Sequence, residues 1–290
     1  MESQRSPVIF LVDNGSLRPA ATLSLRAWAE RLETVLGKPV WPVSLLHSDK
    51  VPPGRLGGIP AQIFDTAVKE AAGRGIREIL VIPFFFGPSA ALTTYLPRRI
   101  RAMRDQRWGR FLNIHVCAPL YDGSPEARNH LARLLEAGVR DTWASHGAEP
   151  HTPVVLVDHG TPQPAVNAVR NDLAAALAER LKVRVLAASM ERREGEAYAF
   201  NEPLLEKAFR EPPFDRGPVV ISMLFLQPGR HAGPDGDVAT ILQAVREQNP
   251  AVQPMMGPLV GEQAWLLDLL VQRYNEGIED AVIGQDDATL

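Results

Sequence analysis

The chain has 290 residues, of which 45% are hydrophobic and 22% charged, and its formal net charge is -3. This length and composition suit soluble globular domains rather than a disordered or fibrous protein, and we expect two domains. So small a net charge gives no general attraction for nucleic acid or for an anionic membrane, and neither is expected as a partner.

The first predicted element is a strand at Val8–Val12, a short apolar run that Asp13 interrupts. The run does not resemble a signal peptide, and no stretch approaches the ~18 apolar residues of a membrane span. Cys117 is the only cysteine, which excludes an intramolecular disulfide and a multi-cysteine metal site. These features favour a cytoplasmic location.

Three sequence landmarks occur twice, in the same order and at a nearly constant separation. The pairs are residues 8–20 with 154–165, 79–91 with 219–231, and 117–120 with 256–259. This repetition indicates two copies of one fold, with a first domain at 1–145 and a second at 146–290.

Within each copy, short apolar runs alternate with longer amphipathic segments, which is typical of α/β domains. In the second copy this pattern predicts strands at 153–158, 183–189, 218–226 and 251–256. It predicts helices at 164–181, 202–210, 237–248 and 262–276. The run VVISMLFL lacks polar alternation, as expected for a parallel strand covered on both faces. Each copy should therefore be a doubly wound, flavodoxin-like parallel sheet.

Three polar side chains follow the first three strands of the second copy. His159 follows the first strand, Glu191 the second, and His231 lies in the glycine-rich loop after the third. In a sheet of order 2-1-3-4 with right-handed crossovers, these loops meet at one rim. Two imidazoles and a carboxylate suit a divalent ion such as Co²⁺, Fe²⁺, Ni²⁺ or Zn²⁺, with positions left open for a substrate.

Each of these residues also has an alternative interpretation. A histidine in a turn often hydrogen-bonds the backbone or caps a helix, and Glu191 lies in a charged run, ERREGE, that could be a solvated loop. The loop QPGRHAGPDGD could be a simple turn or could hold phosphate. It has no nucleotide-binding pattern, so no nucleotide cofactor is expected.

The combination of LVDHGT, Glu191, MLFLQPGRHAGPDGD and a later GPL resembles the class II tetrapyrrole chelatases, the CbiX-like cobaltochelatases and SirB-like sirohydrochlorin ferrochelatases. Long members of that family are tandem repeats. The resemblance implies ATP-independent insertion of Co²⁺, Fe²⁺ or Ni²⁺ into a sirohydrochlorin-type tetrapyrrole, in siroheme or cobalamin biosynthesis. It places the metal-handling and catalytic roles on His159, His231 and Glu191.

The first copy departs from this pattern. Asn14 stands at the position of His159 and Ala91 at the position of His231, while His47 lies where the acidic residue is expected. Asparagine binds cations weakly and alanine not at all, so the active site is expected in the second copy. His47 could equally be an ordinary polar loop residue.

A sirohydrochlorin-like substrate carries eight carboxylates, so the site should offer cations. Arg230 and Arg170 are the candidates for binding the tetrapyrrole. The arginines between Arg98 and Arg110 would form a stripe on one helix, which could contribute or could simply be solvated.

A non-catalytic protein that binds or delivers metal or tetrapyrrole is the alternative function. A nucleotide-dependent flavodoxin-like enzyme would need a phosphate loop, and DHGTPQP is a poor one. A monomer is favoured because a tandem repeat can complete its site within one chain, with a homo-oligomer as the alternative.

Overall fold

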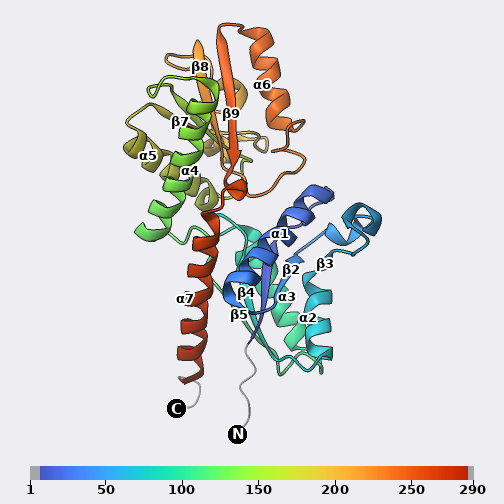
Figure 1. Cartoon of the computed structure of the whole chain (residues 1–290). Helices are drawn as coiled ribbons and strands as arrows, with labels where there is room; N and C mark the ends of the chain where they lie inside the picture. Colours follow the sequence, from blue (N-terminus) through green and yellow to red (C-terminus); the bar gives the residue numbers. More distant parts are fainter. Residues whose placement is uncertain (1–6, 287–290) are drawn as a thin grey trace. The chain divides into compact units, whose positions relative to one another are not determined.

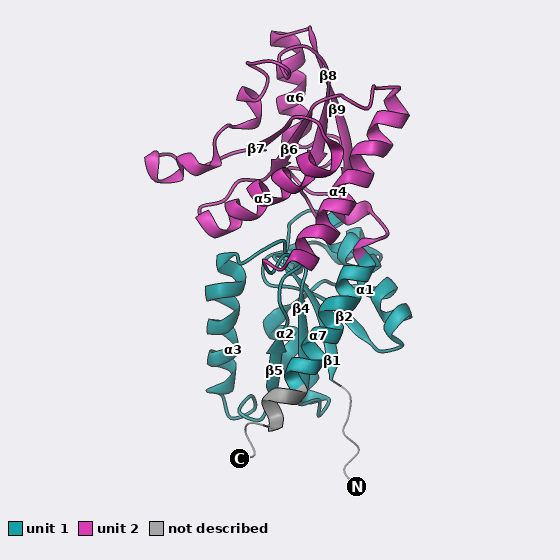
Figure 2. Ribbon diagram, turned by 90° about the vertical axis from the view of Figure 1, so that its left-hand side faces the viewer, with its two compact units in different colours: residues 1–122, 267–290 teal, residues 123–266 magenta. Residues whose placement is uncertain are grey.

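The computed structural model describes residues 7–286, which fold as two compact units (Figures 1 and 2). Among the described residues, the first unit contains those from 7 to 122 and from 267 to 286, while the second unit is Gly123–Leu266. The sequence repeat predicts one boundary, after residue 145, whereas the structure divides the chain after Asp122 and again after Leu266. The helix that ends each sequence repeat packs in the unit built mainly by the other repeat.

The first unit is built on a parallel sheet of order β3-β2-β1-β4-β5. Its strands are β1 (Val8–Asp13), β2 (Val40–Ser44), β3 (Gln62–Ile63), β4 (Glu78–Pro83) and β5 (Asn113–Val116). Its helices are α1 (Pro19–Leu36), α2 (Phe64–Gly73), α3 (Leu96–Arg104) and α7 (Leu266–Asp286). All six residues of β1 are buried, as a central parallel strand covered on both faces requires.

The second unit is built on a parallel sheet of order β7-β6-β8-β9, which confirms the predicted order 2-1-3-4. Its strands are β6 (Val154–Asp158), β7 (Val185–Ser189), β8 (Gly217–Met223) and β9 (Val252–Leu259). Its helices are α4 (Pro125–His146), α5 (Pro164–Leu181) and α6 (Asp237–Gln248). Helix α6 covers one face of the sheet, and α4 and α5 cover the other (Figure 1).

Two of the predicted helices differ from the observed ones. The helix expected at 202–210 is absent: a short 3₁₀ helix, Glu196–Asn201, precedes this segment, and a second one, Leu205–Lys207, lies within it. Pro203 lies between them and has no N–H to donate within a helix. The last helix begins at Leu266 rather than at 262, because Val260–Glu262 forms a separate 3₁₀ turn.

No helix among residues 7–286 is long and apolar enough to cross a lipid bilayer.

Candidate functional site

The turn that carries His159 begins where β6 ends at Asp158. Gly160 has a φ of 90°, a left-handed conformation that favours glycine. A Cβ atom at Gly160 would also lie 1.9 Å from the backbone oxygen of Glu191. Glycine at this position therefore lets the turn approach the loop after β7 closely.

His159 and Glu191 form a pair at the carboxyl ends of β6 and β7. The backbone N–H of Glu191 donates to the backbone oxygen of His159 at 3.2 Å. Their side chains also meet, with 3.2 Å between His159 Nε2 and Glu191 Oε1. The side chains are 47% and 60% exposed, respectively, so a solute can reach both.

His231 lies in the glycine-rich loop between β8 and α6, and Asp237 is the first residue of α6. The Nδ1 atom of His231 is 2.6 Å from Asp237 Oδ2. The backbone N–H of Val238 donates to the backbone oxygen of His231 at 3.1 Å. These contacts orient the ring, and an Nδ1–H that donates to the carboxylate leaves the lone pair on Nε2 for a metal ion or a proton.

The imidazole rings of His159 and His231 lie beside each other, with centroids 4.4 Å apart and planes at 70°. The pKa of His159 is lowered from its ordinary value, first by partial desolvation of the ring and then by His231, while Glu191 opposes the shift. A neutral imidazole, which can bind a divalent metal or accept a proton, is thereby favoured near pH 7. The structure thus brings together the two histidines that follow β6 and β8.

Within the described ranges, no group of three His, Cys, Asp or Glu side chains is arranged to hold a metal ion. The expected ligand set of His159, His231 and Glu191 is adjacent but is not a preformed three-ligand cage. Because Glu191 Oε1 faces His159 Nε2, this carboxylate would have to swing aside before that nitrogen could bind metal.

The two candidate arginines have very different positions. Arg230 has a 71% exposed side chain, with its Nε atom 3.5 Å from Asp237 Oδ2, so its guanidinium is available to a ligand beside His231. Arg170 is only 1% exposed and its guanidinium bonds inside the unit. The expectation that Arg170 contacts a substrate carboxylate is therefore not supported, because a solute cannot reach it.

The first unit forms the same turn without the histidine. Gly15 has a φ of 87°, and the N–H of Leu46 donates to the oxygen of Asn14 at 3.1 Å, as Glu191 does to His159. Leu46, and not His47, therefore occupies the position of the acidic residue. The expected placement of His47 is one residue out of register.

The arginines from Arg98 to Arg110 do not form one helical stripe, because α3 ends at Arg104 and turns follow it. Arg99 forms an ion pair with Asp65 of the same unit. This segment is thus part helix and part turn.

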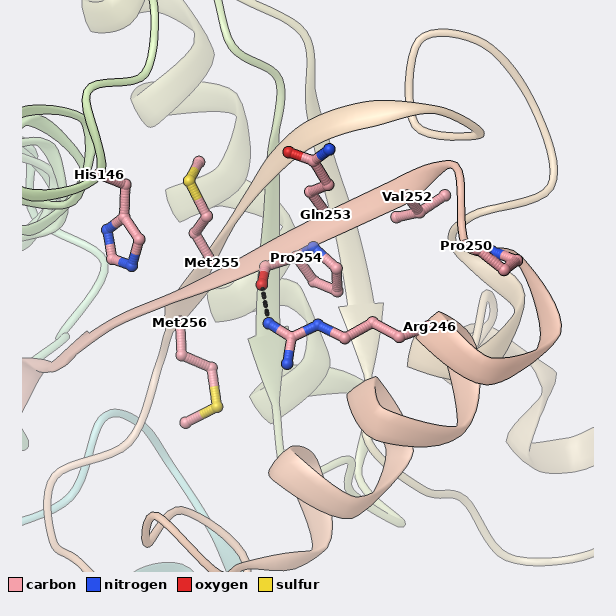
Figure 3. Close-up of a pocket in the computed structure, with 8 residues that line it drawn as sticks. All are labelled: His146, Arg246, Pro250, Val252, Gln253, Pro254, Met255 and Met256. Atoms are coloured by element: carbon pink, nitrogen blue, oxygen red, sulfur yellow. Dashed lines mark hydrogen bonds between the residues drawn. The ribbon is translucent and has the colours of Figure 1, made fainter.

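A hollow of 660 Å³ lies along the outer edge of β9, away from the carboxyl end of that strand (Figure 3). Its lining residues are His146, Arg246, Pro250, Val252, Gln253, Pro254, Met255 and Met256. Arg246 donates to the backbone oxygen of Pro254 at 2.6 Å, and Pro254 has no N–H, so both features protect this edge from pairing with another strand. None of the predicted site residues lines this hollow.

Asp237 is the residue at the site that sequence reasoning missed. It lies six residues after His231 and opens α6, so its carboxylate reaches back to the imidazole. An acidic residue at the end of a glycine-rich loop that carries a histidine is the signal that could have revealed it.

A known protein family matches the second half of the chain in sequence. Residues 153–277 match the CbiX family model. No curated protein is significantly similar to the chain in sequence.

Solved structures match almost the whole chain. SirB from Bacillus subtilis with Fe³⁺ is 16% identical with a TM-score of 0.67, over 93% of this chain and 95% of that one. The sirohydrochlorin chelatase SirB from Bacillus subtilis subspecies spizizenii in complex with cobalt is 16% identical with a TM-score of 0.66, over 94% and 96%. CbiX, the terminal enzyme of siroheme biosynthesis in denitrifying bacteria, is 19% identical with a TM-score of 0.61, over 93% and 98%. At these identities the likeness establishes the fold, and the family match covers residues 153–277 of the chain.

Proposed function

We propose that this protein inserts a divalent metal ion, Co²⁺, Fe²⁺ or Ni²⁺, into a sirohydrochlorin-type tetrapyrrole without ATP or a nucleotide cofactor. The observation that carries the proposal is the contact between the His159 and His231 rings, whose centroids are 4.4 Å apart. Two imidazoles at an accessible rim suit a borderline divalent ion. The SirB structures with Fe³⁺ and with cobalt support the choice of metals.

His231 is the better oriented metal ligand of the two. Asp237 holds its Nδ1 atom, so the ring presents Nε2 in a fixed direction. His159 is held less firmly, since its Nε2 atom meets the exposed carboxylate of Glu191. We infer that the contact between Glu191 and His159 breaks when the metal ion arrives, which frees His159 Nε2 to bind it.

The reaction needs two proton acceptors, because the metal ion replaces two pyrrole protons of the macrocycle. Once the ion has left His159 for the macrocycle, the neutral ring can accept one proton, and its lowered pKa keeps it neutral near pH 7. The carboxylate of Glu191, 3.2 Å from His159 Nε2, can accept the second proton, and both groups can then release their protons to solvent. No redox or phosphoryl step is required.

A site with no preformed three-ligand cage suits metal that is transferred rather than stored. Three firmly held protein ligands would compete with the macrocycle for the ion and oppose its transfer. The guanidinium of Arg230, exposed beside His231, is the cation that we assign to a carboxylate of the tetrapyrrole.

The test is a visible-absorption assay with purified protein, sirohydrochlorin and excess Co²⁺. We expect many equivalents of product per protein, and a fall of at least about a hundredfold in rate for His159→Ala and for His231→Ala. His151→Ala is the matched control, because His151 is an exposed histidine of the same unit outside the site. Wild-type rates in both site variants would refute the proposal, and a plateau at one product per protein would instead indicate a delivery protein.

A further inference from the structure

Arg170 on α5 is a buried charge that the proposed reaction does not use directly. It is 1% exposed, and its guanidinium donates to the backbone oxygen of Asn201 at 3.2 Å and to that of Phe200 at 3.5 Å. It also donates to Ser189 Oγ and lies 3.6 Å from the carboxylate of Asp158. These partners belong to three segments that are separate in the sequence.

Two of these partners hold the turn that carries His159. Asp158 Oδ1 accepts from the N–H of Gly160 at 3.1 Å and from Ser189 Oγ at 2.7 Å. On the other side of the histidine, the amide of Asn201 accepts from the N–H of Thr161 at 3.0 Å and donates to its backbone oxygen at 2.9 Å. The backbone of the turn is therefore fixed both before and after His159.

The first unit shows how the same turn is held without an arginine. There the hydroxyl of Ser48 accepts from the N–H of Ser16 at 3.1 Å and contacts its backbone oxygen at 3.4 Å. Leu25 of α1 stands at the position of Arg170, and it is buried. The turn thus folds without a guanidinium beneath it.

In each unit one side chain hydrogen-bonds the backbone of the turn, Ser48 in the first and Asn201 in the second. These two clamping residues lie at different distances along the chain from the preceding strand. Ser48 comes shortly after β2, which ends at Ser44, so the strand itself positions Ser48. Asn201 comes 12 residues after Ser189 and is the last residue of a short 3₁₀ helix that follows an irregular segment. A clamp on so long a connection needs an anchor of its own, and the bonds from Arg170 to the oxygens of Asn201 and Phe200 supply it.

We propose that Arg170 is a positioning residue: it anchors the 196–201 segment so that Asn201 holds the turn of His159 in place against Glu191. This inference rests on the proposed function. A buried ion pair contributes little net stability relative to apolar packing, and Leu25 shows that apolar packing is sufficient for this turn. The planar fork of Arg170 bonds several acceptors at fixed angles, which a lysine cannot do.

The test compares Arg170→Lys with Arg273→Lys. Arg273 of the first unit is a matched control, because it is also 1% exposed and also bonds a carboxylate and a backbone oxygen. We measure thermal unfolding, the affinity for Co²⁺ alone, and the ¹⁵N signals of the histidine rings in the metal-free protein. Arg170→Lys should lower the Co²⁺ affinity about tenfold and shift the His159 signals, as loss of an outer-shell contact does.

Arg170→Lys and Arg273→Lys should lower the unfolding temperature by similar amounts. Arg273→Lys should leave the Co²⁺ affinity and the His159 signals unchanged. If Arg170→Lys does not fold, Arg170→Met, which keeps the apolar stem but removes every hydrogen bond of the guanidinium, takes its place with the same expected result. A folded variant at position 170 with wild-type Co²⁺ affinity and unshifted His159 signals overturns the inference.

These readouts separate the inference from the proposed function. The ring signals of His159 are measured without metal or tetrapyrrole, so they report positioning even if the wild-type protein fails to insert metal. A wild-type protein that binds Co²⁺ but gives no metallated product would refute the proposed function and leave the role of Arg170 testable.

Discussion

At the scale of single residues, charge and spacing in the sequence identify groups at strand ends better than groups in helices. His159 and His231 were predicted at one rim because each follows a strand, and parallel strands end on the same side. Arg170 was expected to face a ligand, but its place on α5 is buried. A charge in a helix does not reveal which face packs inward, since that depends on the neighbouring elements.

Asp237 gives a sharp test of how His231 works. Asp237→Asn keeps the size of the side chain but replaces the carboxylate that holds His231 Nδ1 at 2.6 Å. We expect the Co²⁺ affinity to fall by about 10- to 100-fold, because the ring loses its orientation and basicity. Isothermal titration with Co²⁺ measures the change.

Asp235→Asn is the control for that titration, because Asp235 is an exposed acid of the same loop. It removes the same charge nearby without touching the histidine. Equal losses in the two variants would show that Asp237 acts only through general electrostatic attraction and would contradict the orienting role.

At the scale of elements, helices with clear start signals were predicted best. The bounds of α5 and α6 match the predicted 164–181 and 237–248, because Pro164 and Asp237 favour a helix start. The predicted helix at 202–210 was wrong because Pro203 interrupts it. Apolar periodicity alone did not show that Asn201, at the end of a 3₁₀ turn, clamps the backbone of Thr161.

The packing of α7 beside the end of β5 buries Cys117 and predicts that its thiol reacts slowly in the native protein. A Cβ atom at Gly277 would lie 2.3 Å from Cys117 Sγ, so this helix packs closely on the sulfur. Burial raises the pKa of Cys117 to about 12. We expect a thiol reagent at pH 8 to label the native protein more than about a hundredfold slower than the urea-unfolded chain.

The raised pKa of Cys117 also determines how the free energy of unfolding changes with pH. Because the fold favours the protonated thiol, this contribution is complete below the ordinary thiol pKa of about 8.5 and is lost as the pH rises towards about 12. Cys117→Ala is the control and should remove this alkaline loss from urea-unfolding curves. Labelling of the native protein at the unfolded rate would contradict the burial of Cys117.

At the scale of the whole molecule, the internal repeat predicted the architecture but not the composition of each unit. Two similar parallel sheets were expected and are observed. The repeat could not show that α4 packs in the second unit and α7 in the first. An amphipathic helix at the end of a repeat reveals an apolar face but not the sheet that covers it.

The two units also differ in the chemistry that they offer. The second unit carries both imidazoles, whereas the first has Asn14 and Ala91 at the corresponding positions. We therefore expect a single metal-handling rim, in the second unit.

The most direct test of this account is X-ray absorption at the cobalt edge on protein loaded with one equivalent of Co²⁺. The account predicts scattering from two imidazole ligands in the wild type and from one in His159→Ala and in His231→Ala, because both rings share one ion. An imidazole signal that is unchanged in both variants would contradict it.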